Sequence, residues 1–117
     1  MDIELAGPGT FAVDVVGVSR RQDVLERASE EGAVVEAHLV LDDENAHDSE
    51  AVAVYLGDEL AGYLSRENAR RYRADLAAAG APRASVRCKA KIVGGFETAN
   101  GERAHFGLRL DLPPLHA

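Results

Sequence analysis

Short runs in which valine or leucine alternates with smaller or more polar residues, each ended by residues typical of turns, recur along this 117-residue chain. The clearest run is AVAVYL at residues 51–56, in which every second residue is valine or leucine. A period of two is typical of a strand with one face in a core. Gly57-Asp58 follows as a two-residue turn signal, which predicts a returning strand over residues 59–64. Asn100-Gly101 predicts a second hairpin turn in the same way.

The pattern predicts six strands in all, and they are expected at residues 11–18, 33–41, 51–56, 59–64, 84–96 and 103–111. Helices are expected at residues 20–31 and 66–79. Ser19 and Gln22 have the spacing of a capping box for the first helix, and Ser65 is the predicted N-cap of the second. At this length the chain is most simply one domain. Six short strands with two helices predict a mainly β fold, a partly closed barrel that hides its strand edges.

The composition excludes several classes of protein. No apolar run approaches the roughly 20 residues of a membrane-spanning helix, and the acidic N-terminus does not resemble a secretory signal. Cys88 is the one cysteine in the sequence, which rules out an internal disulfide and indicates a cytoplasmic location. We interpret Cys88 as an ordinary strand residue rather than a reactive thiol.

The charge is unevenly distributed. The formal net charge is −7, which by itself argues against binding of nucleic acid. Residues 22–61 hold one basic and twelve acidic side chains, whereas residues 62–91 hold eight basic and two acidic ones. This asymmetry predicts one acidic and one basic face, provided that the two segments do not interleave in the fold.

No motif indicates catalysis or a metal. The four histidines fit no metal-ligand spacing, and no nucleophile elbow, phosphate loop or dinucleotide fingerprint occurs. The acidic stretch at residues 42–48 lacks the spacing and central glycine of a calcium loop, so we interpret it as a solvated loop. We therefore expect no enzymatic activity, metal or cofactor. An enzyme built from scattered residues and a cation-binding loop remain as alternatives.

The polar loop that precedes residues 51–56 is the clearest candidate binding element. Asn45, His47 and Asp48 place an amide, an imidazole and a carboxylate directly before a strand. A rigid strand can hold these short polar side chains in position to read a small polar ligand.

Arginines at two predicted helix starts are further candidates. Arg20 and Arg21 stand at the first helix start, and Arg66 and Arg70 lie one turn apart at the second. Free backbone N–H groups at a helix start favour anions, so convergence of the two starts would form a site for phosphate. Tyr63 ends the strand before the second helix and could stack on a base or pack in the core.

Three segments resemble the HIRAN domain, a module of fork-remodelling ATPases of the SWI2/SNF2 type and of free-standing bacterial proteins. They are VVGVS at residues 15–19, NAHDSEAVAV at residues 45–54 and AGYLSRENA at residues 61–69. The resemblance covers about residues 11–110. It places an N-terminal extension at residues 1–10, the domain at residues 11–111 and a C-terminal tail at residues 112–117. The family pattern usually has proline, an aromatic residue and asparagine where this chain has Ala46, His47 and Glu50.

The resemblance implies an OB-like barrel of six strands with two helices. It also implies binding of single-stranded DNA at a free 3′ end, in the context of DNA repair. Any catalysis would come from a helicase or nuclease supplied in trans, and no membrane is involved. The alternative is a protein-interaction module that uses an exposed sheet edge or the acidic face.

The resemblance further implies a role for each candidate residue. Asn45, His47 and Asp48 would meet the terminal nucleotide, with Asp48 accepting a hydrogen bond from the 3′-hydroxyl. Tyr63 would contact the terminal bases, and Arg66 would bind a phosphate. The two arginines at the first helix start would line the same pocket.

Overall fold

The computed structural model describes residues 2–102 and 104–114, and within them a strongly curved sheet with two helices. The strands are β1 (Asp2–Glu4), β2 (Val13–Val16), β3 (Val34–Asp42), β4 (Ala51–Leu56), β5 (Glu59–Leu64), β6 (Ser85–Val93) and β7 (Gly107–Asp111). The helices are α1 (Gln22–Ser29) and α2 (Arg66–Ala78), with one turn of 3-10 helix, η1 (Val18–Arg20), before α1.

Strands β2 to β7 close into a six-stranded antiparallel barrel. The strand order is β1-β6-β3-β4-β5-β2-β7, and a further pairing between β6 and β7 joins the two sides. The predicted mainly β fold, with six barrel strands and two helices, is confirmed. Closure removes most free strand edges, which is the advantage expected of a barrel.

β1 is a seventh strand that the sequence patterns did not predict. It pairs in parallel with Ser85–Arg87 of β6, while β7 pairs with the following part of the same edge. Asp111 holds the chain between β1 and β2, because its Oδ1 accepts a hydrogen bond from the backbone N–H of Gly9 at 2.9 Å. A Cβ on Gly7 would lie 2.5 Å from the same oxygen, so only glycine fits there.

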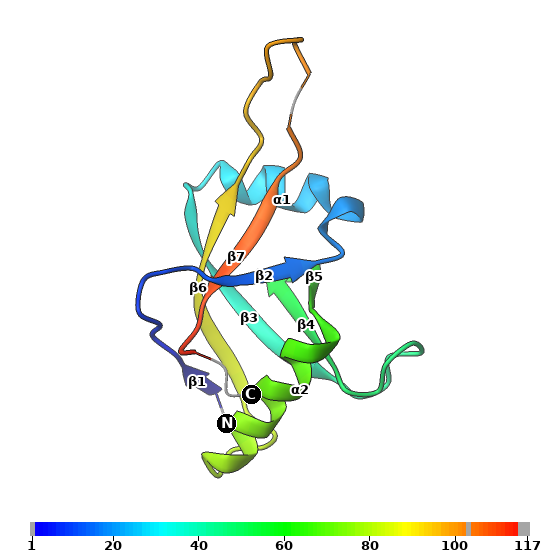
Figure 1. Ribbon diagram of the computed structural model, residues 1–117, viewed down its shortest axis with the longest axis vertical. Helices are drawn as coiled ribbons and strands as arrows, with labels where there is room; N and C mark the ends of the chain where they lie inside the picture. The colour runs from blue at the N-terminus through cyan, green and yellow to red at the C-terminus, as the bar shows by residue number, and fades with distance from the viewer. Residues whose placement is uncertain (1, 103, 115–117) are drawn as a thin grey trace.

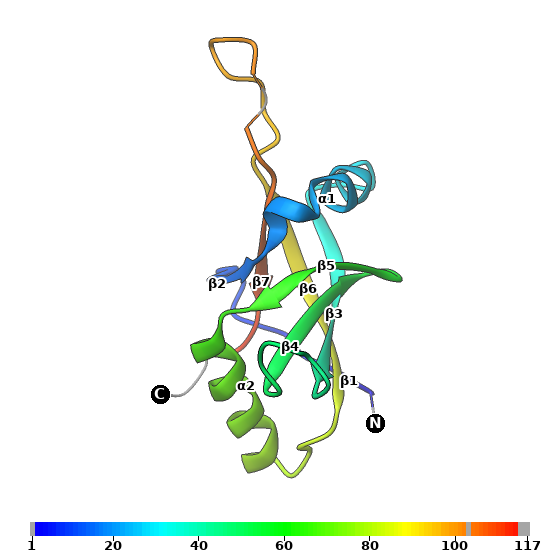
Figure 2. The same cartoon turned by 90° about the vertical axis from the view of Figure 1, so that its right-hand side faces the viewer.

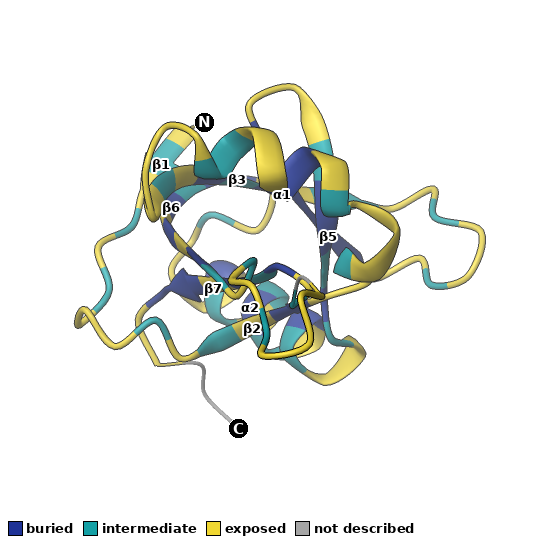
Figure 3. Ribbon diagram, turned by 90° about the horizontal axis from the view of Figure 1, so that it is seen from above, coloured by how far each residue is buried: buried dark blue, intermediate teal, exposed yellow. Residues whose placement is uncertain are grey.

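The core lies inside the barrel, and the helices cover its two ends (Figures 1 and 2). The largest fully buried side chains are Leu25, Leu39, Val52, Val54, Val86, Leu108 and Leu110. The predicted apolar stripe of α2, Ala69, Tyr72 and Leu76, is buried at one end of the barrel. Val24 and Leu25 of α1 are buried at the other end. Figure 3 shows that buried residues lie mainly along the barrel strands and exposed ones mainly in the loops.

The two helix starts differ from each other. At α2 the prediction is confirmed, because the Ser65 Oγ accepts a hydrogen bond from the N–H of Asn68 at 3.1 Å. The capping box predicted at the first helix is wrong. Ser19 lies within η1, and α1 begins at Gln22 without a side-chain cap. The Gln22 amide instead donates to the carbonyls of Val18 and Phe106 and accepts from the Phe106 N–H at 2.7 Å. Three bonds, two of them to a distant segment, outweigh one local cap.

Residues 94–102 and 104–106 belong to an arm that projects from the barrel (Figures 1 and 2). The predicted strands over residues 84–96 and 103–111 are shorter than expected, because β6 ends at Val93 and β7 starts at Gly107. Gly94 and Gly95 have φ values of 78° and 72°, which breaks the extended strand. The arm is still a hairpin, since the N–H of Ala104 donates to the carbonyl of Phe96 at 2.9 Å.

The acidic and basic segments lie directly against each other, and their separation into an acidic and a basic face stays a prediction. β3, from the acidic segment, lies between β4 and β6, and β6 belongs to the basic segment. Ion pairs join the two, including Arg73 with Asp43 at 2.9 Å and Arg87 with Glu36 at 3.8 Å. The charge of one segment is therefore partly neutralised by the other.

Candidate nucleic-acid interface

A hollow of about 280 Å³ lies where the loop before β4, the ends of β2 and β5, and the start of α2 meet. Its lining residues are Val16, Asn45, His47, Asp48, Ala51, Tyr63, Leu64 and Arg66. The structure thus brings together five of the eight candidate residues, which lie up to 21 positions apart in the sequence. Polar groups line one part of the hollow, and Val16, Ala51, Tyr63 and Leu64 line the rest.

Asn45 shapes the loop from within. Its Oδ1 accepts hydrogen bonds from the N–H groups of His47 and Asp48 at 2.9 and 3.1 Å. Its Nδ2 donates to the carboxylate of Asp42 at 3.1 Å. This is the side-chain mimic of a backbone turn for which asparagine is favoured. Both ends of the amide are therefore engaged within the protein, and Asn45 acts by holding the next three residues in place.

Asp48 carries the negative charge of the hollow. Its side chain is 12% exposed, and its Oδ1 accepts a hydrogen bond from the N–H of Glu50 at 3.0 Å. That bond is the main cause that lowers the pKa of Asp48, with Arg70 and Arg66 adding to it and desolvation opposing it. The carboxylate is therefore ionised at neutral pH. An ionised carboxylate can accept about four hydrogen bonds, so a donor from a ligand can still be accommodated.

Arginines on one face of α2 fasten the loop to the helix. The Arg66 Nη2 donates to the carbonyl of His47 at 3.3 Å, and Arg70 lies 3.4 Å from a carboxylate oxygen of Asp48. Arg73 donates to the carbonyls of Glu50 and Ala51, each at 2.8 Å. Arg73 was not among the residues predicted to belong to the site. Its signal was the spacing of residues 66, 70 and 73, which places them on one face of a helix.

The apolar side of the hollow depends on close packing of β2 against β5. Val16 pairs with Tyr63 across these strands, and Val16 is 44% exposed. A Cβ at Gly62 would lie 2.4 Å from the carbonyl oxygen of Val16, so a side chain there would force the strands apart. Gly17 turns away from β2 with a φ of 77°, and it leaves the Tyr63 ring partly exposed beside Val16. An aromatic ring beside an aliphatic side chain offers a surface on which a base can stack.

Arg20 and Arg21 are exposed and stand outside the lining of this hollow. Arg20 ends η1, and Arg21 immediately precedes α1. Neither guanidinium group forms an ion pair with any residue that the structure describes. Both side chains are thus available to an external anion, on the segment that directly follows β2.

In a comparison with protein-family models, the chain matches the HIRAN domain over residues 8–92. The matched residues make up more than half of the chain. The chain belongs to the HIRAN family. HIRAN domains are in general DNA-binding modules. No curated protein and no solved structure gives a significant match.

The HIRAN match includes all eight residues that line the hollow, and it ends within β6. The projecting arm and β7 lie beyond it, although β7 closes the barrel. The boundaries expected at residues 10 and 111 stay predictions.

The part of the HIRAN chain that the structure describes offers little for metal binding, thiol chemistry or membrane insertion. No group of three His, Cys, Asp or Glu side chains there could hold a metal ion. Burial raises the pKa of the Cys88 thiol to about 12, so it is protonated and unreactive at neutral pH. Among the described helices, none combines the length and apolar character needed to cross a membrane.

Proposed function

We propose that this HIRAN domain binds single-stranded DNA and reads a free 3′ end, without catalysis of its own. One observation carries the proposal. The ionised carboxylate of Asp48, the guanidinium group of Arg66 and the ring of Tyr63 all line the same hollow of about 280 Å³. These groups match the hydroxyl, phosphate and base of a terminal nucleotide.

The 3′-hydroxyl is the group that Asp48 is suited to recognise. A hydroxyl can donate to the carboxylate, and such charge-assisted hydrogen bonds are stronger than neutral ones. A 3′-phosphate would instead bring a second negative charge beside Asp48 and be repelled. Discrimination between a 3′-hydroxyl and a 3′-phosphate thus follows from the largely buried carboxylate of Asp48, whose loop Asn45 holds in place.

The phosphodiester backbone would be bound by Arg66, and the base would lie against Tyr63 and Val16. The guanidinium group of Arg66 makes one long hydrogen bond, to the His47 carbonyl at 3.3 Å, and the residue is exposed. Its other donors can therefore reach a phosphate. We expect the protein to act in the cytoplasm, where a helicase or nuclease supplied in trans would carry out any repair chemistry.

Fluorescence anisotropy with 5′-labelled oligonucleotides tests the proposal. At low salt, a strand with a 3′-hydroxyl should bind more tightly than the same strand with a 3′-phosphate. Asp48→Ala should reduce that preference, and Arg66→Ala should weaken binding to both strands. Arg71→Ala is the matched control, since Arg71 lies on the same helix, pairs with Glu67 and does not line the hollow.

Two results would overturn the proposal at different levels. Equal affinity for the two oligonucleotides would remove the reading of the 3′ end and leave only DNA binding. An absence of binding at low salt would remove single-stranded DNA as the ligand.

A further inference from the structure

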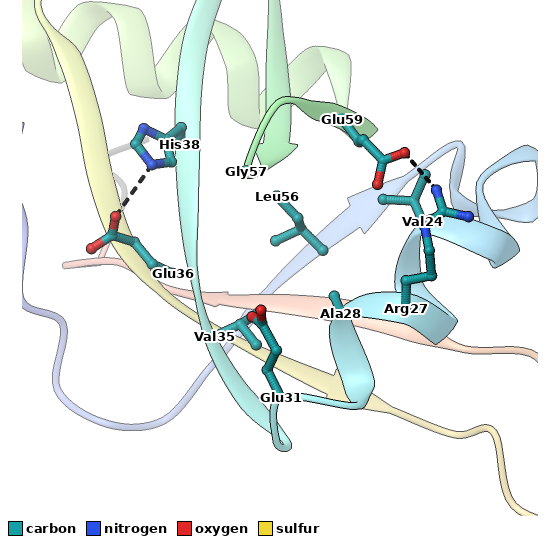
Figure 4. A pocket seen from close by; sticks show the side chains of 10 residues that line it. All are labelled: Val24, Arg27, Ala28, Glu31, Val35, Glu36, His38, Leu56, Gly57 and Glu59. Carbon is teal, nitrogen blue, oxygen red and sulfur yellow. Dashed lines mark hydrogen bonds and ion pairs between the residues drawn. The ribbon is translucent and has the colours of Figure 1, made fainter.

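A second, larger groove lies away from the candidate DNA site. Its volume is about 440 Å³, and it is bounded by α1, by β3 and by the turn between β4 and β5 (Figure 4). Val24, Ala28, Val35 and Leu56 give it an apolar floor. None of its lining residues lines the hollow around Asp48.

One wall of the groove is an unpaired stretch of strand edge. The N–H of Ile92 donates to the carbonyl of Ala33 at 2.8 Å, in register with the β3–β6 ladder. Residues in an antiparallel strand direct their backbone groups alternately to its two sides. Residues 33, 35 and 37 therefore bond to β6, and Val34 and Glu36 direct their N–H and C=O groups to the opposite side.

That opposite side is the one that faces the groove. β4 covers it only from His38 onward, because β4 ends at Leu56 and the chain turns at Gly57. No described strand pairs with Val34 or Glu36 on this edge. In Figure 4 the free edge of β3 faces Leu56 and α1 across the groove. An uncovered edge beside an apolar floor is a template for an added strand.

The rim of the groove is acidic. Glu31, Glu36 and Glu59 line it, against a single guanidinium group, that of Arg27. Arg27 pairs with Glu59, and the carboxylate of Glu36 lies 3.2 Å from the imidazole of His38 and 3.8 Å from the guanidinium group of Arg87, which is outside the groove lining. Glu31 forms no ion pair with any residue in the described part of the chain. A strand that enters the groove therefore meets excess negative charge, which favours basic side chains.

We propose that this groove binds an extended, basic segment of a partner protein, which adds to the edge of β3 as a short strand. The backbone of the segment pairs with Val34 and Glu36. Alternate side chains point to opposite faces of a strand, so apolar ones pack on Val35 and Leu56 while lysine or arginine side chains meet the acidic rim. The proposal goes beyond DNA binding and uses none of its residues.

A defined peptide tests the proposal. The probe is an acetylated and amidated heptapeptide of alternating lysine and valine, titrated into ¹⁵N-labelled protein. Chemical shifts should change at the residues that line the groove, and exchange of the Glu36 amide should slow. The same peptide with methylated backbone nitrogens should bind about tenfold more weakly, as expected for the loss of one good hydrogen bond. A glutamate–valine peptide should not bind.

Two charge-reversing variants distinguish binding in the groove from a general attraction of the cationic peptide to the negatively charged protein. Glu31→Lys should weaken binding of the lysine–valine peptide several-fold. Glu30→Lys makes the same change of charge at a neighbouring exposed residue outside the groove, and should leave binding nearly unchanged. The two variants should bind oligonucleotides equally, so a failure of this proposal is distinguishable from a failure of DNA binding.

Several outcomes would overturn the inference. Equal binding of the methylated peptide would exclude strand addition, and equal effects of the two variants would exclude the acidic rim as the selective element. Shift changes outside the groove would place the peptide elsewhere. A concentration-dependent dimer in sedimentation velocity that protects the Glu36 amide would assign the edge to a second copy of this chain.

Discussion

Asn45 and Asp48 stand three residues apart in one loop, yet their side chains face different partners. Both ends of the Asn45 amide bond within the loop, whereas Asp48 lines the hollow with an ionised carboxylate. Of these two residues, only Asp48 contacts the DNA terminus in our proposal. Asn45 contributes by fixing the backbone that carries Asp48. Asn45 is therefore a positioning residue, and Asp48 is the residue that recognises the DNA.

Replacement of Asn45 by alanine tests this division. Asn45→Ala removes two bonds to the N–H groups of His47 and Asp48 and one to Asp42. We expect it to lower the free energy of unfolding by about 2–3 kcal/mol, since three hydrogen bonds are lost and each contributes about 1 kcal/mol net. Urea unfolding measures the change. His47→Ala is the control in the same loop, because it keeps the backbone bonds of residue 47 and should change stability little. Equal losses for the two variants would contradict the assignment.

At the scale of elements, the sequence was sufficient to predict those structures whose hydrogen bonds join residues close together in the chain. The β4–β5 hairpin follows from Gly57-Asp58, and the start of α2 follows from Ser65. β1 and the bonds of Gln22 could not be predicted, because their partners lie more than 80 positions away along the chain. The loop at residues 45–48 was recognisable by composition and resemblance, but its attachment to Arg73 depends on how α2 packs.

Gln22 connects the start of α1 to the segment that leads into β7. Its side-chain amide donates to the carbonyl of Phe106 at 2.9 Å and accepts from the N–H of Phe106 at 2.7 Å. Gln22→Ala removes both bonds and a third to Val18, so we expect a loss of about 2–3 kcal/mol in the free energy of unfolding. Chemical denaturation measures it. Arg21→Ala, at the adjacent exposed position, should be nearly neutral. A neutral Gln22→Ala would show that these bonds do not stabilise the native state.

At the scale of the whole molecule, ion pairs between the loop before β4 and the region of α2 make the free energy of unfolding depend on pH. Hydrogen bonds from Arg83 and Arg73 lower the pKa of Asp43 from 3.8 to about 2. A group whose pKa is lower in the folded state stabilises the fold above its ordinary pKa. That contribution is lost as the pH falls from about 4 through 2.

Asp43→Asn tests this dependence. The variant should be less stable than the unmodified protein at pH 5 to 7, and the difference between the two should shrink as the pH falls from about 4 to 2. Urea midpoints at a series of pH values measure it. Asp58→Asn is a control, since no ion pair of Asp58 occurs among the described residues and its curve should run parallel to that of the unmodified protein. A difference for Asp43→Asn that stays constant down to pH 2 would contradict the assigned pKa.

The net charge of −7 requires that DNA contacts be concentrated on the few arginines left without an acidic partner. Arg20 and Arg21 are such residues among those described, and they directly follow the strand whose Val16 lines the hollow. If the strand of DNA leaves the hollow along η1, each of them neutralises one phosphate.

For single strands, each phosphate contact contributes about −0.7 to the slope of log K against log salt concentration. The double variant Arg20→Ala with Arg21→Ala should therefore reduce the magnitude of that slope by about 1.4. Anisotropy titrations over a range of salt concentrations measure it, with Arg71→Ala as the matched control. A slope that is unchanged in the double variant would show that the DNA does not follow η1, and would favour a path along α2.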